Sequence, residues 1–528
     1  MPRLADFRPL ITILLGFFQL SMAQPANEIS GRVTDGQNPI SKAVIRSSAD
    51  TNTTLSDSNG NFELMVANNL PSILISIWKE GYYNGTSIVK NSDSKVEIVL
   101  IPLPEEDNHS YTWIDPAPNS EGANYHCGDC HQDIYQQWLN SGHAKSASDS
   151  IFLDTYNGWN AVGIPSYQPG YRLDYPHSEG NCSNCHAPAA AVKNLIGVNV
   201  NELSKVERLG VSCDFCHKIK DIQLKENKSV NTGIMHLELL RPSKGDHIYF
   251  GPYEDSPKPY SYSPTISKSE FCAPCHEGSF WGVPIYETYS EWANSAYSGQ
   301  NIYCQNCHMP SDGSTNQIVQ LENAKDRDPS TIHSHLFKGT EDSSFIASAV
   351  QMFTKYEVKK GIIHLSVEIK NVGAGHSIPT GQPMRNMILL VEAIDSQGDV
   401  LEYIGENYIP FWGGKGDPGE GNYEGLPGKG FAKVLFEHYS QYVQLKLGVK
   451  WQHIFPAPQW RVVTIKLNSR IAAQNSDVST YDFVISDNKS PFTVTSRLFY
   501  RKTFKNWATM KNWKLKDILL AENVIKIK

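Results

Sequence analysis

Five copies of the pentapeptide Cys-x-x-Cys-His constrain the fold of this chain more than any other feature. They contain all ten cysteines of the 528 residues, so no cysteine remains for a structural disulfide. Two thiols at this spacing, followed at once by histidine, are the attachment signature of c-type haem. The predicted attachment residues are Cys127, Cys130, Cys182, Cys185, Cys213, Cys216, Cys272, Cys275, Cys304 and Cys307, and the predicted proximal iron ligands are His131, His186, His217, His276 and His308.

Other chemistries of paired cysteines fit this pattern less well. Structural zinc uses Cys-x-x-Cys pairs two at a time and has no role for a histidine after every pair. A disulfide between residues three apart is strained and does little to staple a fold. Iron–sulfur clusters need cysteines without the trailing histidine. The sequence therefore predicts five covalently bound haem c groups.

The region that holds the motifs has little material for a conventional core. Residues 127–307 are rich in Gly, Pro, Ser and Tyr and contain few long periodic apolar stretches. Five porphyrins would bring large apolar faces and ten covalent links to the polypeptide. We therefore expect the cofactors to form the core, and the chain without haem to be largely unfolded between Cys127 and His335.

The N-terminal region shows a different, β-rich pattern. Short strand-like runs separated by Gly, Pro, Asn and Asp occupy residues 28–103 and predict a small antiparallel sandwich. Residues 31–35 (GRVTD) and the hairpin at 57–62 (DSNGNF) resemble the carboxypeptidase regulatory-like domain. That resemblance implies an immunoglobulin-like module without catalysis, used for folding or docking. Residues 102–119 are predicted to form a linker.

The C-terminal third is also predicted to be β-rich. Apolar residues alternate with polar ones at 363–369, which predicts a half-buried strand. Further strands are expected at 387–394 and 461–467, and helices at 431–444 and 505–522. The fold class is multidomain: a signal peptide at 1–23, a carboxypeptidase regulatory-like β-sandwich at 24–104, a mostly irregular and α-helical pentahaem cytochrome c domain at 105–345, and a β-rich, sandwich-like C-terminal domain at 346–528.

An export signal is predicted at the start of the chain. Arg3 and Arg8 precede or flank an apolar run at 10–20, and a small-residue pattern ends at Ala23, where cleavage is expected. The run is shorter than the roughly 20 residues that span a bilayer. The cleaved chain is therefore expected not to span a membrane and to be periplasmic or extracellular, in agreement with haem c attachment outside the cytoplasmic membrane.

The second axial ligand decides what each haem iron does, because a second histidine leaves only electron transfer and an open position admits small molecules. Twelve histidines lie outside the motifs, enough for five closed haems. Three of them, His364, His438 and His453, are expected to be ordinary solvated residues. His126 touches Cys127 and is too close to reach the far side of its own haem.

Five segments carry a more specific pattern: residues 135–144 (YQQWLNSGHA), 210–218 (GVSCDFCHK), 304–310 (CQNCHMP), 335–339 (HLFKG) and 371–381 (NVGAGHSIPTG). They resemble the multihaem cytochromes related to hydroxylamine oxidoreductase and its tetrahaem electron acceptor, over roughly residues 120–400. The resemblance implies closely packed haem pairs, mostly with two histidine ligands. On this basis the expected distal ligands are His143, His335 and His376, followed by His177 and then by His236 or His247.

One departure concerns a repeat within the chain. Residues 289–297 (YSEWANSAY) repeat the pattern at 135–143, but Tyr297 stands where the first copy has His143. One iron is therefore expected to lack a ligand from this place or to take it from elsewhere. The first cysteines of successive motifs are 55, 31, 59 and 32 residues apart, an alternation that fits an old duplication.

The favoured function is an exported pentahaem cytochrome that relays electrons between a membrane-linked donor and a downstream periplasmic or extracellular acceptor. The alternative is a reductase or oxidase of a small nitrogen or sulfur compound at one open haem, although no catalytic residue is assigned. A cell-surface adhesion protein with secondary haems is a third hypothesis. The 47 basic and 55 acidic side chains give a net charge of −8, which argues against a nucleic-acid partner.

Overall fold

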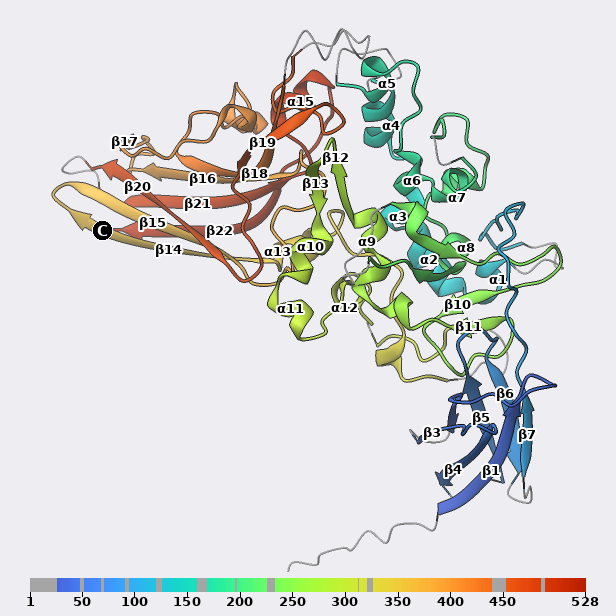
Figure 1. Cartoon of the computed structure of the whole chain (residues 1–528). Helices are drawn as coiled ribbons and strands as arrows, with labels where there is room; N and C mark the ends of the chain where they lie inside the picture. The colour runs from blue at the N-terminus through green and yellow to red at the C-terminus, as the bar shows by residue number, and fades with distance from the viewer. Residues whose placement is uncertain are drawn as a thin grey trace, which may run out of the picture. The chain divides into compact units, whose positions relative to one another are not determined.

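The computed structural model (Figure 1) describes residues 26–47, 52–67, 71–90, 95–119, 126–158, 169–194, 197–225, 233–311, 313–320, 326–438, 453–485 and 490–528. The predicted signal peptide lies outside these residues. Contacts divide the chain into two compact units, one of Met1–Leu103 with Tyr253–Tyr262 and one of Pro104–Pro252 with Ser263–Lys528. Within the described segments, no helix has the length and apolar character needed to cross a membrane.

The first unit contains two small β-sheets. One has the order β4-β1-β7 and the other the order β3-β2-β5-β6. Apolar residues such as Val33, Ile45 and Ile75 form its buried core. The pairing of β1 with β7 is parallel, which differs from the all-antiparallel sandwich predicted from sequence. The strands are β1 (Ala26–Thr34), β2 (Val44–Ser47), β3 (Thr53–Leu55), β4 (Asn61–Ala67), β5 (Ser72–Trp78), β6 (Gly85–Lys90) and β7 (Val96–Val99).

The turn before β4 follows from local chemistry. The side chain of Asp57 accepts hydrogen bonds from the backbone N–H groups of Asn59 and Asn61, each at 2.8 Å. Gly60 has a φ of +78°, and a Cβ there would lie 2.3 Å from the Val33 carbonyl oxygen. The hairpin predicted at 57–62 therefore needs glycine at this position for both conformation and space.

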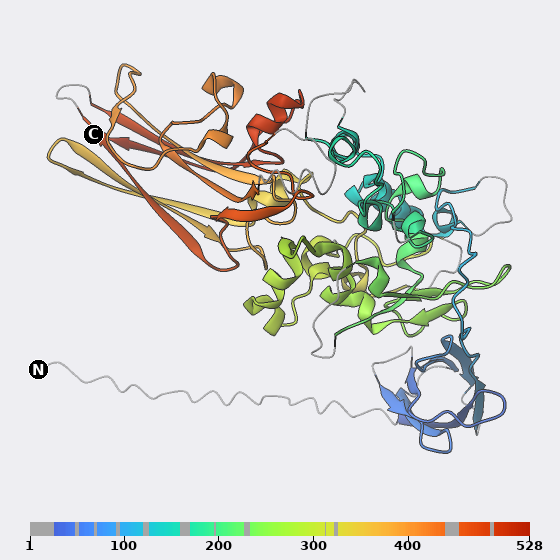
Figure 2. The same cartoon turned by 45° about the horizontal axis from the view of Figure 1, so that its top comes forward.

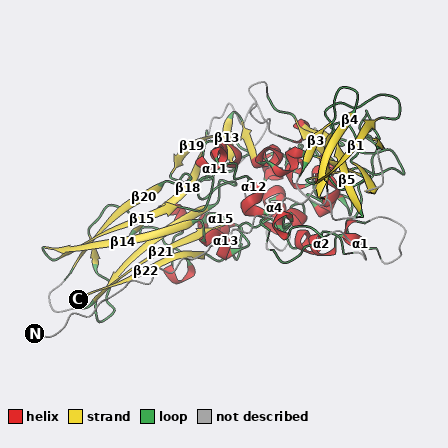
Figure 3. Cartoon of the chain, turned by 90° about the horizontal axis from the view of Figure 1, so that it is seen from below, coloured by secondary structure: helices red, strands yellow, loops and turns green. Residues whose placement is uncertain are grey.

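The part of the second unit that carries the motifs consists of short helices joined by irregular segments (Figure 3). Its longest helices, α2 and α4, have eight residues each. The helices are α1 (Cys127–Cys130), α2 (Gln132–Leu139), α3 (Gly142–Lys145), α4 (Ser150–Asn157), α5 (Tyr171–Asp174), α6 (Ser183–His186), α7 (Pro188–Ala191), α8 (Cys213–Cys216), α9 (Ala273–His276), α10 (Thr288–Ala293), α11 (Ala296–Gly299), α12 (Cys304–His308) and α13 (Ser343–Ala347).

Short strands accompany these helices. They are β8 (Ile219–Ile222), β9 (Leu237–Leu239), β10 (Tyr249–Gly251), β12 (Glu277–Phe280) and β13 (Val283–Glu287), and β11 (Tyr260–Tyr262) belongs to the first unit. Residues 104–119, predicted to be a linker, are in fact tied to this region. Asp107 pairs with the buried guanidinium of Arg241, and the Trp113 indole N–H donates to the Ala189 carbonyl at 2.8 Å.

The C-terminal part of the second unit is built from two larger sheets, which run side by side in Figures 1 and 2. Their orders are β14-β15-β20-β17 and β19-β18-β16-β21-β22. Between them lies the largest apolar cluster of the described residues. The elements are β14 (Val350–Lys359), β15 (Ile362–Asn371), β16 (Asn386–Ile394), β17 (Glu402–Tyr403), β18 (Gly428–Glu437), β19 (Val463–Asn468), β20 (Ser476–Val484), β21 (Phe492–Arg501), α15 (Lys505–Met510) and β22 (Ile518–Ile527).

The predicted fold class is confirmed: β-rich regions lie at both ends of the chain and a helical, irregular region lies between them. The alternation at 363–369 forms β15, in which the four apolar side chains are at most 1 % exposed. The strands expected at 387–394 and 461–467 correspond to β16 and β19. Two helix predictions were wrong in part, because 431–437 belongs to β18 and 518–522 to β22, while α15 covers only the start of the second stretch.

Candidate haem sites

Each of the five motifs lies on or beside one short helix, and we number them sites 1 to 5 in chain order. The helices are α1, α6, α8, α9 and α12. Residues three and four apart share a helix face, so this local conformation directs both cysteines and the histidine to one side. In site 3, the Ser212 hydroxyl caps α8 by accepting from the Phe215 N–H at 3.3 Å. No disulfide joins any of the ten cysteines.

The attachment cysteines of different sites touch one another. Three pairs of cysteines are in side-chain hydrogen-bond contact. They are Cys127 of site 1 with Cys213 of site 3, Cys272 of site 4 with Cys304 of site 5, and Cys185 of site 2 with Cys275 of site 4. Cys216 of site 3 also lies near both cysteines of site 4. The five sites therefore form one connected cluster with the order 1–3–4–5, and site 2 joins it at site 4.

Four of the five motif histidines have the same hydrogen bond. Their Nδ1 atoms donate to backbone carbonyl oxygens: His131 to Ile318 at 2.9 Å, His186 to Ser146 at 2.7 Å, His217 to Phe250 at 2.6 Å and His308 to Lys338 at 2.6 Å. Donation from Nδ1 leaves Nε2 as an unprotonated ligand nitrogen and fixes the orientation of the ring. These histidines therefore fit the role of proximal iron ligand.

Two further histidines face motif histidines at the separation that a shared iron requires. The ring centroids of His143 and His276 are 6.2 Å apart, and so are those of His376 and His308. Metal–imidazole bonds of about 2.0–2.1 Å place the ring centres of two opposite ligands about 6 Å apart. The chain's own residues therefore fit a bis-histidine haem at site 4 and at site 5.

The electrostatics of these rings agree with ligation by neutral imidazole. Burial lowers the pKa of His143 to about 3, with a further contribution from the neighbouring His276, and burial lowers the pKa of His276 to about 4. Nδ1 of His143 is buried without a hydrogen-bond partner. Burial also raises the pKa values of Cys182 and Cys216 to about 12, as expected for thiols in an apolar enclosure.

Comparisons with known proteins agree with this geometry. The family model for cytochrome c554 and c-prime matches residues 126–218, which hold sites 1, 2 and 3. The chain is similar to a solved penta-heme cytochrome c552 from Thermochromatium tepidum, with a TM-score of 0.54 and 21% identity, covering 76% of this chain and 97% of that chain. No curated protein sequence matches the chain. The family match covers the first three sites, and the similarity to the penta-heme structure shows a shared fold over most of the chain.

The fold brings a third expected distal residue, His335, near the motif histidines of sites 1 and 3. Burial lowers the pKa of His335 to about 4, and the charges of the His217 and His131 rings lower it further. Nδ1 of His335 donates to the His333 carbonyl at 3.0 Å, and Nδ1 of His333 donates to the Met309 carbonyl at 2.9 Å. His333 thus has the same ligand-like hydrogen bond, although it is not among the distal ligands expected from the sequence.

The remaining expected ligands lie elsewhere. His177 is exposed after α5, His236 is half-buried at the start of β9, and His247 is half-buried with its ring 6.4 Å from that of Tyr249. Among the described residues, none of these three histidines has its ring in contact with the ring of a motif histidine. The His-x-His spacing at 333–335 was the sequence signal for His333. Histidines placed against carboxylates are His109, His364 and His453.

Site 2 lies in an aromatic cluster. The ring that stacks on His186 is Phe152 of α4, with centroids 3.7 Å apart and planes 4° from parallel. All 17 histidines lie in the described part of the chain, and within it no second histidine ring contacts His186. Tyr156 continues the aromatic cluster around this site, and its hydroxyl donates to Glu179 at 3.0 Å.

Tyr297, which replaces a histidine in the repeat, has a structural role. Its hydroxyl donates to the Val372 carbonyl at 3.0 Å, and its ring carbon would lie 3.3 Å from a Cβ at Gly375. It therefore packs against the loop that carries His376. In the first copy, His143 instead faces His276 of site 4, so the equivalent residues of the two copies have different roles.

Buried ion pairs hold the C-terminal sheets against the haem region. Arg461 pairs with Asp174 of α5 through its Nε at 2.8 Å and with Glu437 of β18 through its Nη1 at 2.7 Å, and all three side chains are at most 1 % exposed. Lys511 pairs with Asp154 of α4 at 2.7 Å and is also buried. These contacts fix the β-sheets relative to α4 and α5.

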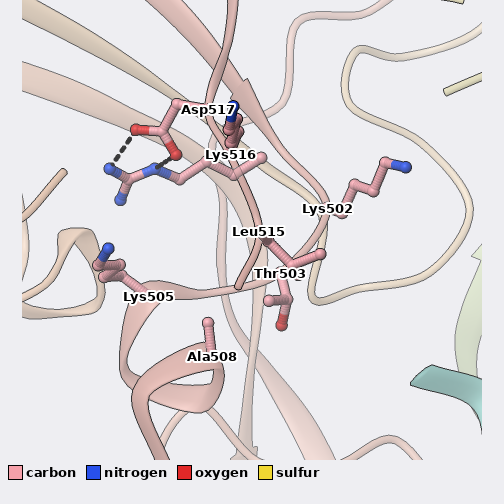
Figure 4. Close-up of a pocket in the computed structure, with 8 residues that line it drawn as sticks. Lys502, Thr503, Lys505, Ala508, Leu515, Lys516 and Asp517 are labelled. Carbon is pink, nitrogen blue, oxygen red and sulfur yellow. Dashed lines mark hydrogen bonds and ion pairs between the residues drawn. The ribbon is translucent and has the colours of Figure 1, made fainter. Parts of the chain in front are cut away.

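A small pocket lies among residues 501–517 of the C-terminal region (Figure 4). Its lining includes the ion pair of Arg501 with Asp517 at 2.7 Å and several lysines, of which Lys502 pairs with Glu341. None of the lining residues belongs to a motif or is a candidate ligand. The pocket is therefore separate from the haem sites.

Proposed function

We propose that the chain is an exported pentahaem c-type cytochrome that relays single electrons between a membrane-linked donor and a periplasmic or extracellular acceptor. The observation that carries this proposal is the set of contacts and close approaches between attachment cysteines, which links all five sites into one cluster. Haem iron supplies one-electron redox chemistry, and the polypeptide sets each potential through ligands, burial and hydrogen bonds. Neighbouring haems attached at touching cysteines exchange electrons over short distances.

The proposed ligand assignment is supported by ring contacts at sites 4 and 5 and by the proximity of His335 to His217 at site 3. His276 and His143 hold the iron of site 4, His308 and His376 that of site 5, and His217 and His335 that of site 3. His131 is the proximal ligand of site 1, and His333 replaces His177 and His247 as the fourth distal candidate. Two histidine ligands close an iron to substrates, which favours electron transfer over catalysis at these sites.

Removal of single haems tests the relay. The variant C182A/C185A should bind four haems per chain and still equilibrate electrons among them, because site 2 lies on a branch. The variant C272A/C275A should separate sites 1 and 3 from site 5, since site 4 joins them. We expect a single fast redistribution phase after photoreduction in the first variant and an additional slow phase in the second.

Haem content measured for each preparation provides the control. Five haems in the unmodified chain and four in each variant are expected. A relay through the proposed junction is contradicted if C272A/C275A retains four haems and redistributes electrons as fast as C182A/C185A. A haem count below five in the unmodified, fully matured chain contradicts the pentahaem assignment itself.

A second function is favoured by one observation, the environment of His186. No other histidine contacts the His186 ring or contributes to the lowering of its pKa, whereas His335 interacts with both His217 and His131. The iron of site 2 is therefore the candidate for an open position. It would bind a small nitrogen or sulfur compound, such as nitrite or hydroxylamine. Low-temperature electron paramagnetic resonance should then show one high-spin haem that shifts on addition of nitrite and is absent from C182A/C185A. A purely low-spin spectrum of the unmodified chain contradicts this function.

A further inference from the structure

The two copies of the Tyr-x-x-Trp pattern form equivalent structures. In α2 the rings of Tyr135 and Trp138 are 5.9 Å apart, and in α10 those of Tyr289 and Trp292 are 5.5 Å apart. Each helix is followed by a serine whose N–H donates to the tryptophan carbonyl at 2.9 Å. The duplication inferred from the sequence spacing therefore has a counterpart in backbone contacts.

Each tryptophan holds the proximal side of one haem site. The indole N–H of Trp138 donates to the Val211 carbonyl at 2.9 Å, and that of Trp292 donates to the Ile302 carbonyl at 2.8 Å. Val211 and Ile302 lie two residues before the first cysteine of site 3 and of site 5, respectively. The same two residues donate their N–H groups to the carbonyls of His143 and Tyr297.

The residue before each tryptophan holds the distal side of the same site. Oε1 of Gln137 accepts the N–H of His335 at 2.9 Å. Oε2 of Glu291 accepts the N–H of Ser377 at 3.1 Å and the hydroxyl of Thr380 at 2.8 Å. His335 is the distal candidate of site 3, and Ser377 follows the distal candidate of site 5. Two consecutive residues of one helix thus tie both sides of one haem together.

We propose that Gln137 and Glu291 are positioning residues that set the distal histidines of sites 3 and 5. The proposal rests on the proposed bis-histidine relay and deepens it. Both distal histidines lie outside helices and strands, so few backbone hydrogen bonds of regular structure hold them. A single side-chain acceptor that orders such a segment removes conformational freedom that would otherwise compete with iron ligation.

Because the two residues differ in charge, variants of them can test the effect of the hydrogen bond and the effect of the charge separately. Gln137 is neutral, whereas Glu291 also lies 2.5 Å from the guanidinium of Arg470. Glu291→Gln removes the charge and keeps the acceptor, and Gln137→Glu adds a charge and keeps the acceptor. Glu291→Leu and Gln137→Leu remove the acceptor. Gln136→Leu, on the exposed face of the same helix, is the matched control.

The experiment measures spin state and carbon monoxide binding of the fully haem-loaded protein. We expect each leucine variant to show one additional high-spin haem and to bind up to one more carbon monoxide per chain after reduction, with a raised reduction potential for that haem. The conservative variants and Gln136→Leu should resemble the unmodified protein. Low-spin leucine variants with a full haem content, or conservative variants that behave like the leucine ones, overturn the proposal.

Double variants keep the test decisive if a leucine variant is unstable. If Gln137 acts through His335, Gln137→Leu should add no further high-spin haem to His335→Ala, and the same holds for Glu291→Leu with His376→Ala. Additive effects at a second haem contradict the positioning role. Failure of the relay is distinguished by the unmodified protein, whose sites 3 and 5 would then already be high-spin or fail to exchange electrons.

Discussion

A chain made in a host that cannot attach haem is expected to leave residues 127–335 unfolded while the C-terminal sheets still fold. The helices that carry the sites have no more than eight residues, and isolated helices shorter than about 12–15 residues are marginal in water. By contrast, β15 and β16 bury Ile363, Leu365 and Leu389 in an apolar cluster that contains no haem ligand.

Hydrogen exchange followed by mass spectrometry checks this expectation. Amides of α2, α8 and α12 should exchange rapidly in the haem-free chain and slowly in the haem-loaded chain, because only the latter has a core around them. Amides of β15, β16 and β20 should stay protected in both, and they serve as the internal control. Equal protection of the site helices in the two preparations would show that the polypeptide alone builds this region.

Arg461→Met is expected to lower the free energy of unfolding of the haem-loaded protein by about 3–5 kcal/mol, because it removes the fully buried cation that two buried carboxylates share. Arg461 is fully buried and contacts both Asp174 and Glu437. Arg497→Met is the matched control, since Arg497 also bridges two carboxylates, Glu392 and Glu522, but on the surface. Arg497→Met should lower the free energy of unfolding by only about 0–1 kcal/mol.

The effect of Arg461→Met should also depend on pH. Burial raises the pKa of Asp174, and Arg461 acts against this rise. An acid whose pKa is higher in the folded than in the unfolded chain binds a proton on folding, so the folded state gains stability as the pH falls. Denaturant titrations should therefore show that Arg461→Met loses less free energy of unfolding at about pH 5 than at about pH 8. A loss that is independent of pH, or as small as that of Arg497→Met, contradicts the role of this ion pair.

The sequence was most informative where the chemistry is local. Attachment of haem needs two thiols and a histidine within five residues, and such a motif can be recognised without knowing the fold. The alternation at 363–369 predicted β15 for the same reason, since side chains along a strand alternate between its two faces. The helix prediction for residues 431–437 failed because β18 is an interior strand of a five-stranded sheet and is buried on both faces, which hides the period of two.

Contacts between distant segments were beyond sequence reasoning. Local patterns around His143 and His376 marked them as candidate ligands, but His143 meets His276 and His376 meets His308 only because the chain folds back on itself. The roles of Gln137 and Glu291 were hidden for the same reason, because each accepts a hydrogen bond from a segment far along the chain.

The sequence by itself predicted covalent haem attachment and determined that β-rich regions flank the motif region, because spacing within a few residues and the alternation of side chains specify both. Only the tertiary structure decided which attachment cysteines touch and which histidines face one another. Those relations depend on packing between segments separated by tens to hundreds of residues, and hydrogen bonds from α2 and α10 and buried ion pairs such as Arg461 with Asp174 hold them in place.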